Sequence, residues 1–319
     1  MRHVAWVLLG IPVGIVLLYY GSEWMVDGAK NLALRLGVTP FAVGLTVVAF
    51  GSSAPEFATC VMSSEAPALI LGNIVGSNIA NVGLAIGLVA LLTPVVSKFQ
   101  AIRFEMWSML AVIAMVALFA ADGAISRIEG LALVLSLFVF VYLTFRLKKP
   151  DGEPVQDRGV PAGGREGSLA FQSVLVLVGI ALLFLGAKAF IDGAKELAAT
   201  LGASELLVGL LVVALGTSLP EFSICIMAGV KGENEILVSN IVGSIIFNST
   251  LALGAGAMLV SIPVSDPALF YHIPVMAAFA LAMFLSVRFR DGIGRLAGGA
   301  MLVAYLAYVF SLGLFPALA

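Results

Sequence analysis

Charged side chains are scarce in this sequence. Asp, Glu, Lys and Arg make up 11% of its 319 residues, whereas a soluble globular domain carries about 25%. Hydrophobic residues make up 61%, and apolar runs of about 20 residues, the length that crosses the hydrocarbon core of a bilayer, recur along the chain. This composition excludes an ordinary soluble domain and predicts an all-α polytopic membrane protein surrounded by the lipid bilayer.

Cysteine and histidine are nearly absent, with two residues of each. Cys60 and Cys225 both lie in apolar segments, which predicts buried thiols and provides neither a disulfide framework nor the spacing of a metal site. The net charge of −2 provides no basic surface for a nucleic acid. We therefore expect no nucleic-acid partner and no cofactor.

The chain repeats itself at long range. Segment 44–57 resembles 209–222, at a shift of 165 residues, and segment 73–77 recurs as 240–244, at a shift of 167. Repeats of this length indicate a duplicated structural unit. We predict a first five-helix repeat over 1–147 and a second over 170–319, joined by a Gly-, Pro- and charge-rich linker over 148–169.

The apolar runs predict ten transmembrane helices, five in each half. The first half contains spans at 4–20 (with a longer amphipathic continuation), 40–63, 69–92, 105–121 and 128–147. The second contains spans at 171–190 (again extended), 204–230, 236–262, 268–287 and 295–316. Glu105, beside the start of a span, is expected at the membrane interface.

An odd number of spans in each half turns the second repeat upside down relative to the first. The positive-inside rule then tests the orientation. With the N-terminus outside, 13 of the 17 Lys and Arg residues fall on the cytoplasmic side, and only Arg2, Arg127, Lys188 and Lys195 do not. We predict a multi-pass protein of the cell membrane with both termini outside and the linker cytoplasmic. Inverted repeats of this kind build secondary transporters.

Two related polar motifs interrupt apolar runs in equivalent places, GSSAPEF at 51–57 and GTSLPEF at 216–222. Pro55 and Pro220 lack an N–H, so the carbonyls of Gly51 and Gly216 lose their helical partners. Such carbonyls are tolerated at membrane depth only inside protein or beside a wet cavity. The motifs therefore predict broken helices 2 and 7 at a central site.

Each motif also gathers oxygen atoms. Ser52 and Ser53 share a helix face with Glu56, as Thr217 and Ser218 share one with Glu221. A carboxylate at the bilayer centre costs about 3 kcal/mol or more and usually marks an ion pathway. Neither motif contains a basic residue that could neutralise its acid. Two helical stripes spaced by four residues add further oxygens: Asn73, Ser77, Asn81 and Asn240, Ser244, Asn248.

Ligands that are all oxygen point to hard cations such as Ca²⁺ or Na⁺. One Ca²⁺ balances the charges of Glu56 and Glu221, and several Na⁺ could occupy the same oxygens. A site that holds either set of ions, but not both, is the physical requirement for exchange.

At these motifs the chain resembles the sodium/calcium exchanger family of the cation/calcium antiporter superfamily, in its prokaryotic form. The resemblance implies an antiporter that exchanges Na⁺ for Ca²⁺ by alternating access, with the first and sixth spans as a sliding pair. It implies that Glu56 and Glu221 coordinate both ions together with the hydroxyls of Ser52, Ser53, Thr217 and Ser218 and the carbonyls of Ala49 and Ala214. Flanking sodium sites would use Ser77, Asn81, Ser244 and Asn248.

Two positions depart from the family pattern. Ser52 stands where Thr is usual, which keeps the hydroxyl. Asn248 stands where some relatives, including potassium-dependent exchangers, carry Asp, which argues against potassium coupling and leaves the fine ion preference open. We expect one copy to be sufficient for transport, while the oligomeric state stays open.

Three other functions are alternatives for a membrane protein with two buried acids: a proton-coupled exchanger, an enzyme and a channel. Glu56 and Glu221 could carry protons if burial favours their neutral forms, which would make the protein a proton-coupled exchanger of Ca²⁺ or another divalent cation. Two acids could also serve an intramembrane acid/base enzyme, but that interpretation leaves the Ser/Asn stripes and the duplication unexplained. We therefore expect that the protein is not an enzyme. A channel would differ from an antiporter in conducting ions without a counter-ion gradient.

Overall fold

The computed structural model describes residues 9–63, 65–147, 168–200 and 214–314. The first half begins with one long helix, α2 (Gly10–Leu36). The second span is divided into four pieces: α3 (Pro40–Val43), the π-helical turn η1 (Gly44–Val48), α4 (Ala49–Ser52) and α5 (Ala54–Met62). The remaining elements of this half are α6 (Pro67–Ala80), the π-helical turn η2 (Asn81–Ile86), α7 (Gly87–Leu92), β1 (Val95–Val96), α8 (Phe99–Ala120), β2 (Ala124–Ile125) and α9 (Arg127–Leu147).

The second half follows the same order. It begins with the long helix α10 (Leu169–Thr200), and a broken segment follows after the residues that are not described, as α12 (Ala214–Thr217) and α13 (Leu219–Val230). The remaining elements are α14 (Asn234–Phe247), the π-helical turn η4 (Asn248–Ala252), α15 (Leu253–Leu259), β3 (Ile262–Pro263), the π-helical turn η5 (Ala268–His272), α16 (Ile273–Arg290), β4 (Gly292–Ile293) and α17 (Arg295–Leu314).

The helices confirm an all-α polytopic membrane protein. Within the described residues, eight helical segments are long and apolar enough to cross a membrane, and Leu219–Val230 is a shorter apolar helix. The predicted total of ten is not established, because 204–213 of one predicted span and 4–8 of another lie outside the described residues. The linker predicted over 148–169 also lies outside them, apart from its last two residues.

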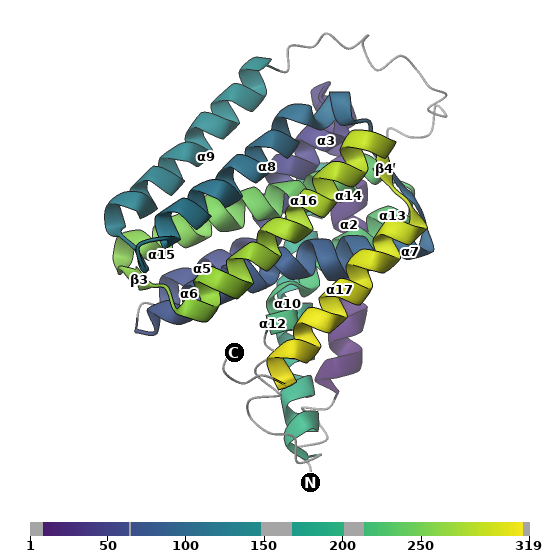
Figure 1. Cartoon of the computed structure of the whole chain (residues 1–319). Helices are drawn as coiled ribbons and strands as arrows, with labels where there is room; N and C mark the ends of the chain where they lie inside the picture. Colours follow the sequence, from purple (N-terminus) through teal and green to yellow (C-terminus); the bar gives the residue numbers. More distant parts are fainter. Residues whose placement is uncertain (1–8, 64, 148–167, 201–213, 315–319) are drawn as a thin grey trace.

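The helices form one bundle, in which α8 runs between α9 and α16 (Figure 1). Its centre holds the segments that carry the Ser/Asn stripes. Within an 18-residue apolar stretch of each span, 94% of the residues are buried in Asn234–Leu259 and 78% in Pro67–Leu92, whereas only 17% are buried in Arg295–Leu314. A helix that is apolar but little buried within the protein faces lipid, so the two stripe helices form the core and α17 belongs to the periphery.

The long helices α2 and α10 cross as an antiparallel pair along a seam of glycines. A methyl group added at Gly14 would lie 2.7 Å from the Gly186 carbonyl oxygen, and one added at Gly21 would lie 3.0 Å from that of Gly179. The two positions of each helix are seven residues apart and occupy corresponding places in the two halves. Small residues at such spacing let membrane helices approach to backbone contact.

Two short antiparallel strand pairs tie connections of one half to connections of the other. Val95 pairs with Ile293 in the β1–β4 pair, and Ile125 pairs with Ile262 in the β2–β3 pair. At a shift of 167 or 168 residues, β1 corresponds to β3 and β2 to β4, so exchanging the halves exchanges the two pairs. The strands were not predicted, since two-residue segments carry no periodicity.

Candidate metal centre

Both polar motifs break their helices at the same place. Ser53 separates α4 from α5 with φ −85° and ψ 4°, and Ser218 separates α12 from α13 with φ −88° and ψ 5°. Pro55 and Pro220 then stand in the first turn of the new helix, where a missing N–H costs nothing. The predicted breaks are confirmed, and they place Glu56 and Glu221 in the first turns of α5 and α13, where the helix dipole favours a negative charge.

The two acids are completely buried and only half satisfied. Glu56 and Glu221 are both 0% exposed. Ser77 Oγ donates to Glu56 Oε1 at 3.4 Å, and Ser53 Oγ donates to Glu221 Oε1 at 3.0 Å. The Oε2 atom of each acid is buried without a hydrogen-bond partner, and among the described residues neither acid enters an ion pair.

The Ser53 contact crosses between the halves. The sequence places Ser53 on one face with Glu56 of its own motif, but its hydroxyl donates to Glu221 of the other motif. This happens because Ser53 stands at the helix break rather than inside a continuous helix. The two motifs are therefore directly joined, which a single amphipathic face does not predict.

Among the described residues, further buried polar atoms without partners belong to residues that the sequence analysis named as candidate ligands. These atoms are the oxygens Ser218 Oγ, Asn248 Oδ1 and Asn81 Oδ1, together with the nitrogen Asn81 Nδ2. Asn81 and Asn248 begin η2 and η4, and π-helical turns of this kind are frequent at functional sites. Buried polar atoms normally have partners, so this group of atoms is suited to hold a ligand.

The other hydroxyls of the motifs are held by asparagines of the opposite half. Ser52 Oγ lies 3.2 Å from Asn240 Oδ1 and 3.2 Å from the Ala49 carbonyl, and 3.5 Å from Ser244 Oγ. Its single proton can serve only one of these acceptors at a time. In the other half, Thr217 Oγ1 donates to Asn73 Oδ1 at 3.5 Å.

The same asparagines reach the two thiols. The Nδ2 atom of Asn240 donates to Cys225 Sγ at 3.7 Å, and that of Asn73 donates to Cys60 Sγ at 4.0 Å. Cys60 and Cys225 are both 0% exposed, which confirms their predicted burial. The thiols thus act as weak acceptors that orient an amide.

The carbonyls implied by the family resemblance are differently placed. The Ala49 carbonyl accepts the backbone N–H of Ser53 at 3.0 Å as well as the Ser52 hydroxyl, so it already takes part in the helix end. Ala214 opens α12, one turn before Ser218. A carbonyl oxygen has two lone pairs, and the Ala49 oxygen therefore meets a cation only by giving up or sharing one of these bonds.

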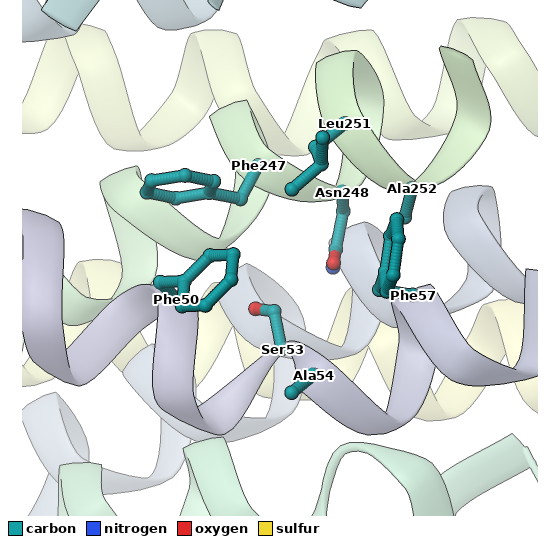
Figure 2. A pocket seen from close by; sticks show the side chains of 8 residues that line it. All are labelled: Phe50, Ser53, Ala54, Phe57, Phe247, Asn248, Leu251 and Ala252. Atoms are coloured by element: carbon teal, nitrogen blue, oxygen red, sulfur yellow. The ribbon is translucent and has the colours of Figure 1, made fainter. Parts of the chain in front are cut away.

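Two cavities border this group at equivalent positions of the repeat. The wide cavity, of about 340 Å³, is lined by Ala80, Asn81, Leu84, Ala85, Phe190, Ala194, Gly216, Ser218, Leu219 and Phe222. The narrow cavity, of about 20 Å³, is lined by Phe50, Ser53, Ala54, Phe57, Phe247, Asn248, Leu251 and Ala252. Figure 2 shows the Asn248 amide and the Ser53 hydroxyl pointing into the narrow cavity between the phenylalanine rings.

Asn78 is a polar contact that the repeat did not reveal. It is 1% exposed, and its side chain bonds to both Asn248 and Ser249. The position equivalent to Asn78 in the second half is Ile245. Similarity between the halves identifies only residues that occur in both, so it does not reveal a polar residue that occurs in one half alone.

The donor set is one of oxygens. Among the described residues, no three His, Cys, Asp or Glu side chains gather as a metal cluster, and the candidate ligands are two carboxylates with hydroxyl, amide and carbonyl oxygens. Such ligands suit hard cations. Membrane-length helices surround two buried acids that have no basic partner in the part of the chain that the structure describes. These features define the class: a polytopic membrane transporter of cations.

Comparisons with known proteins agree. The family model described as "Sodium/calcium exchanger protein" matches residues 6–146 and 171–313. The sodium/calcium exchanger MaX1 of Methanosarcina acetivorans is 30% identical and covers 93% of this chain and 95% of its own. The putative antiporter CaxA of Alkalimonas amylolytica is 33% identical over 95% of this chain and 97% of its own. A structure of the sodium-calcium exchanger NCX_Mj, soaked with 10 mM Na⁺ and 10 mM Sr²⁺, matches with a TM-score of 0.85 and 30% identity over 97% of this chain and 99% of its own. The chain belongs to the sodium/calcium exchanger family.

Proposed function

We propose that this protein exchanges Na⁺ for Ca²⁺ across the membrane as a secondary active antiporter. The observation that carries the proposal is the state of the two acids, Glu56 and Glu221, which are fully buried, lack any ion pair among the described residues and each keep one oxygen without a partner. A buried charge is stable only when an opposite charge or strong hydrogen bonds compensate it. Metal cations supply that compensation here.

The proposed ligands are those implied at the motifs. Glu56 and Glu221 bind at the centre, where the two negative charges are balanced by one Ca²⁺. The hydroxyls of Ser52, Ser53, Thr217 and Ser218 and the carbonyls of Ala49 and Ala214 contribute there. Na⁺ uses these oxygens and also the flanking ones of Ser77, Asn81, Ser244 and Asn248. Because both kinds of ion need the same carboxylates, binding of one kind excludes the other.

Two of the hydroxyls are already oriented for this task. Ser53 and Ser77 give their protons to Glu221 and Glu56. A hydroxyl has one proton and two lone pairs, so the lone pairs of both oxygens stay available for a cation. In each carboxylate this hydroxyl is bound by Oε1, and Oε2 has no hydrogen-bond partner among the described residues.

The architecture proposed around the site is a pair of inverted repeats, 1–147 and 170–319, in a cell membrane with both termini outside and 148–169 cytoplasmic. Contacts between connections support this arrangement. The orientation puts the connections of β1 and β4 on one side, those of β2 and β3 on the other, and Lys231 on the same side as Asp27. The strands pair accordingly, and Lys231 Nζ lies 2.6 Å from Asp27 Oδ1.

The packing of α2 and α10 supports alternating access. Their glycine seam brings backbone against backbone, and we take it as the surface along which the pair shifts. The wide cavity reaches Asn81 and Ser218 of the candidate site, and we take it as the open entrance. Transport then needs one copy of the chain, and no catalytic step is part of the proposal.

Proteoliposomes loaded with Na⁺ test the function. An outward Na⁺ gradient should drive uptake of ⁴⁵Ca²⁺, and Glu56→Gln or Glu221→Gln should abolish it, since each leaves a single charge for a divalent ion. Circular dichroism and gel filtration verify that the variants fold. Uptake that follows a pH gradient without Na⁺ would instead establish proton coupling, and uptake without any counter-ion gradient would establish a channel.

A further inference from the structure

Asn248 differs from Asn81 in how the protein holds its amide. Asn248 Nδ2 donates to Asn78 Oδ1 at 3.3 Å, while Asn248 Oδ1 is buried without a partner. Neither end of the Asn81 amide has a partner within the described ranges, and Asn81 lines the wide cavity. A hydrogen bond therefore orients the Asn248 amide, whereas no hydrogen bond from the described residues orients the Asn81 amide.

The direction of the Asn78 amide is fixed by its surroundings. Its Nδ2 donates to Ser249 Oγ at 2.9 Å and lies 3.5 Å from Met276 Sδ. A thioether sulfur can only accept, so the atom facing Met276 has to be the nitrogen. An amide whose orientation is otherwise ambiguous is assigned by such a contact, and the Asn78 oxygen must then face Asn248.

This direction is passed on to Asn248. An acceptor at Asn78 Oδ1 requires a donor opposite it, and the only donor of the Asn248 side chain is Nδ2. Asn248 Oδ1 is consequently turned away from Asn78 and into the narrow cavity, where Figure 2 shows the amide beside Ser53. Ser53 lines the same cavity and donates to Glu221, so this amide borders the space beside the acid pair.

We infer that Asn78 is a positioning residue that holds the Asn248 carbonyl oxygen toward the cation site and thereby makes the two flanking sites unequal. The inference rests on the proposed function and on Asn248 as one of its ligands. An oxygen that is already oriented binds an ion without reorganisation. At Asn81 the ion itself has to orient the amide, because Ile245, at the position equivalent to Asn78, cannot hydrogen-bond through its side chain.

The consequence is a difference between the two cations. Ca²⁺ is balanced by the two carboxylates, whereas Na⁺ also needs the neutral flanking oxygens. Loosening the Asn248 amide should therefore weaken Na⁺ binding more than Ca²⁺ binding. A residue that only supports folding would weaken both alike.

The test uses Asn78→Leu in the full chain, with Ile245→Leu as the matched control that places leucine at the equivalent buried position. In proteoliposomes, Asn78→Leu should raise the Na⁺ concentration for half-maximal Ca²⁺ exchange about fivefold, the loss of roughly one hydrogen bond. The KM for Ca²⁺ should change less than about twofold, and Ile245→Leu should leave both values near wild type.

A double mutant shows whether Asn78 acts through Asn248. Once Asn248→Leu has removed the oxygen, adding Asn78→Leu should cause no further loss of Na⁺ affinity, since coupled residues are not additive. If Asn78→Leu does not fold, Ser249→Ala loosens the same amide from its other end and should raise the Na⁺ requirement about twofold.

The possible results distinguish failure of this inference from failure of the proposed function. Independent, additive losses in the double mutant would overturn the inference while leaving the proposed function intact, as would equal effects of Asn78→Leu on both ions. An unchanged Na⁺ requirement in Ser249→Ala would do the same if it is the variant used. Wild-type protein whose Ca²⁺ flux ignores Na⁺ would overturn the proposed function itself, and the inference with it.

Discussion

The wide and narrow cavities occupy equivalent places in the two halves, yet their volumes are about 340 Å³ and about 20 Å³. Phe50 and Phe247 close the narrow one, with ring centroids 5.6 Å apart. The position equivalent to Phe247 in the first half is Ala80, on the wall of the wide cavity. At this position the halves differ in side-chain size, and the larger side chain lies on the narrow cavity.

The long helices α2 and α10 also differ in how closely each covers the neighbouring polar motif. Met25 of α2 is fully buried, and a methyl group added at Gly51 of the first motif would lie 3.2 Å from its Cε atom. The residue of α10 equivalent to Met25 is Phe190, which lines the wide cavity. One helix closes over its motif and the other leaves space, as expected of an exchanger that opens its site to one side at a time.

Ion pairs hold the closed side. Lys231, in the turn after α13, contacts Asp27 at 2.6 Å and Glu23 at 3.8 Å, and Lys30 pairs with Glu233. The positions of α10 that correspond to Asp27 and Lys30 are Asp192 and Lys195. Within the part of the chain that the structure describes, these two form no ion pair, so α2 is fastened where α10 is not.

The largest effect is expected from breaking the seam on which the two helices meet. Gly14→Ala puts a methyl group 2.7 Å from both the Gly186 carbonyl oxygen and the Phe190 amide nitrogen. Overpacking of this kind costs about 1 to 3 kcal/mol. We expect a lower melting temperature in detergent and slower Ca²⁺ exchange. Gly299→Ala is the control, because its methyl group would meet only a flexible leucine atom at 3.4 Å. Equal stability of the two variants would contradict a close-packed seam.

Filling the wide cavity should make the halves alike. Ala80→Phe introduces the ring that its counterpart Phe247 already carries, into a space large enough to receive it. Because Asn81 and Ser218 border this space, we expect Ca²⁺ exchange to fall about tenfold, corresponding to about 1.4 kcal/mol, with little loss of melting temperature. The matched change in the other half, Phe247→Ala, should lower the melting temperature, since it empties a packed position. Normal exchange by Ala80→Phe would show that ions enter elsewhere.

The sequence alone predicted the acid pair, the helix breaks and the Cys burial, because each appears twice and repetition separates a motif from chance. The sequence did not predict features that occur in only one half or that depend on contacts between the halves. Asn78 has no counterpart, and the Ser53–Glu221 contact depends on how the two motifs face each other. The start of the fourth span was predicted too late, because α8 begins at Phe99, six residues before the predicted span. Glu105 therefore lies in the second turn of α8, where neighbouring helices bury it completely.

The ligand roles of the individual oxygens stay predictions, and the structure ranks these oxygens by how each is oriented. Ser53 donates to Glu221 and Asn248 donates to Asn78. Among the residues that the structure describes, Asn248 Oδ1 has no partner and the Asn81 amide has none at either end. The contrast between halves arises from contacts between distant segments, which no local pattern contains.

Loosening the ion pairs of α2 should have a smaller effect. Lys231→Gln removes the contacts with Asp27 and Glu23, whose side chains are partly exposed. Such pairs contribute about 0.2 to 1 kcal/mol and are screened by salt. We expect faster amide hydrogen exchange at the turn around residue 231. The rate of Ca²⁺ exchange in proteoliposomes should change by up to about fivefold, and its difference from wild type should shrink as choline chloride is added. Lys195→Gln, at the equivalent of Lys30 on α10, should change neither quantity. A salt-independent effect of Lys231→Gln would contradict an ion-pair clamp.

The smallest effect should come from the thiols that orient the asparagines. Asn240 donates to Cys225 at 3.7 Å and Asn73 to Cys60 at 4.0 Å, so the second-half contact is the shorter of the two. Cys225→Ala removes the acceptor, frees the Asn240 amide and should raise the KM for Ca²⁺ about twofold through Ser52, because a weak hydrogen bond is worth a few tenths of a kcal/mol. Cys60→Ala should have a weaker effect in the same direction. Cys225→Ser, which keeps an acceptor of similar size, should restore the wild-type KM. If alanine and serine at position 225 behave alike, the thiol only fills space and the asparagine is oriented by Ser52 alone.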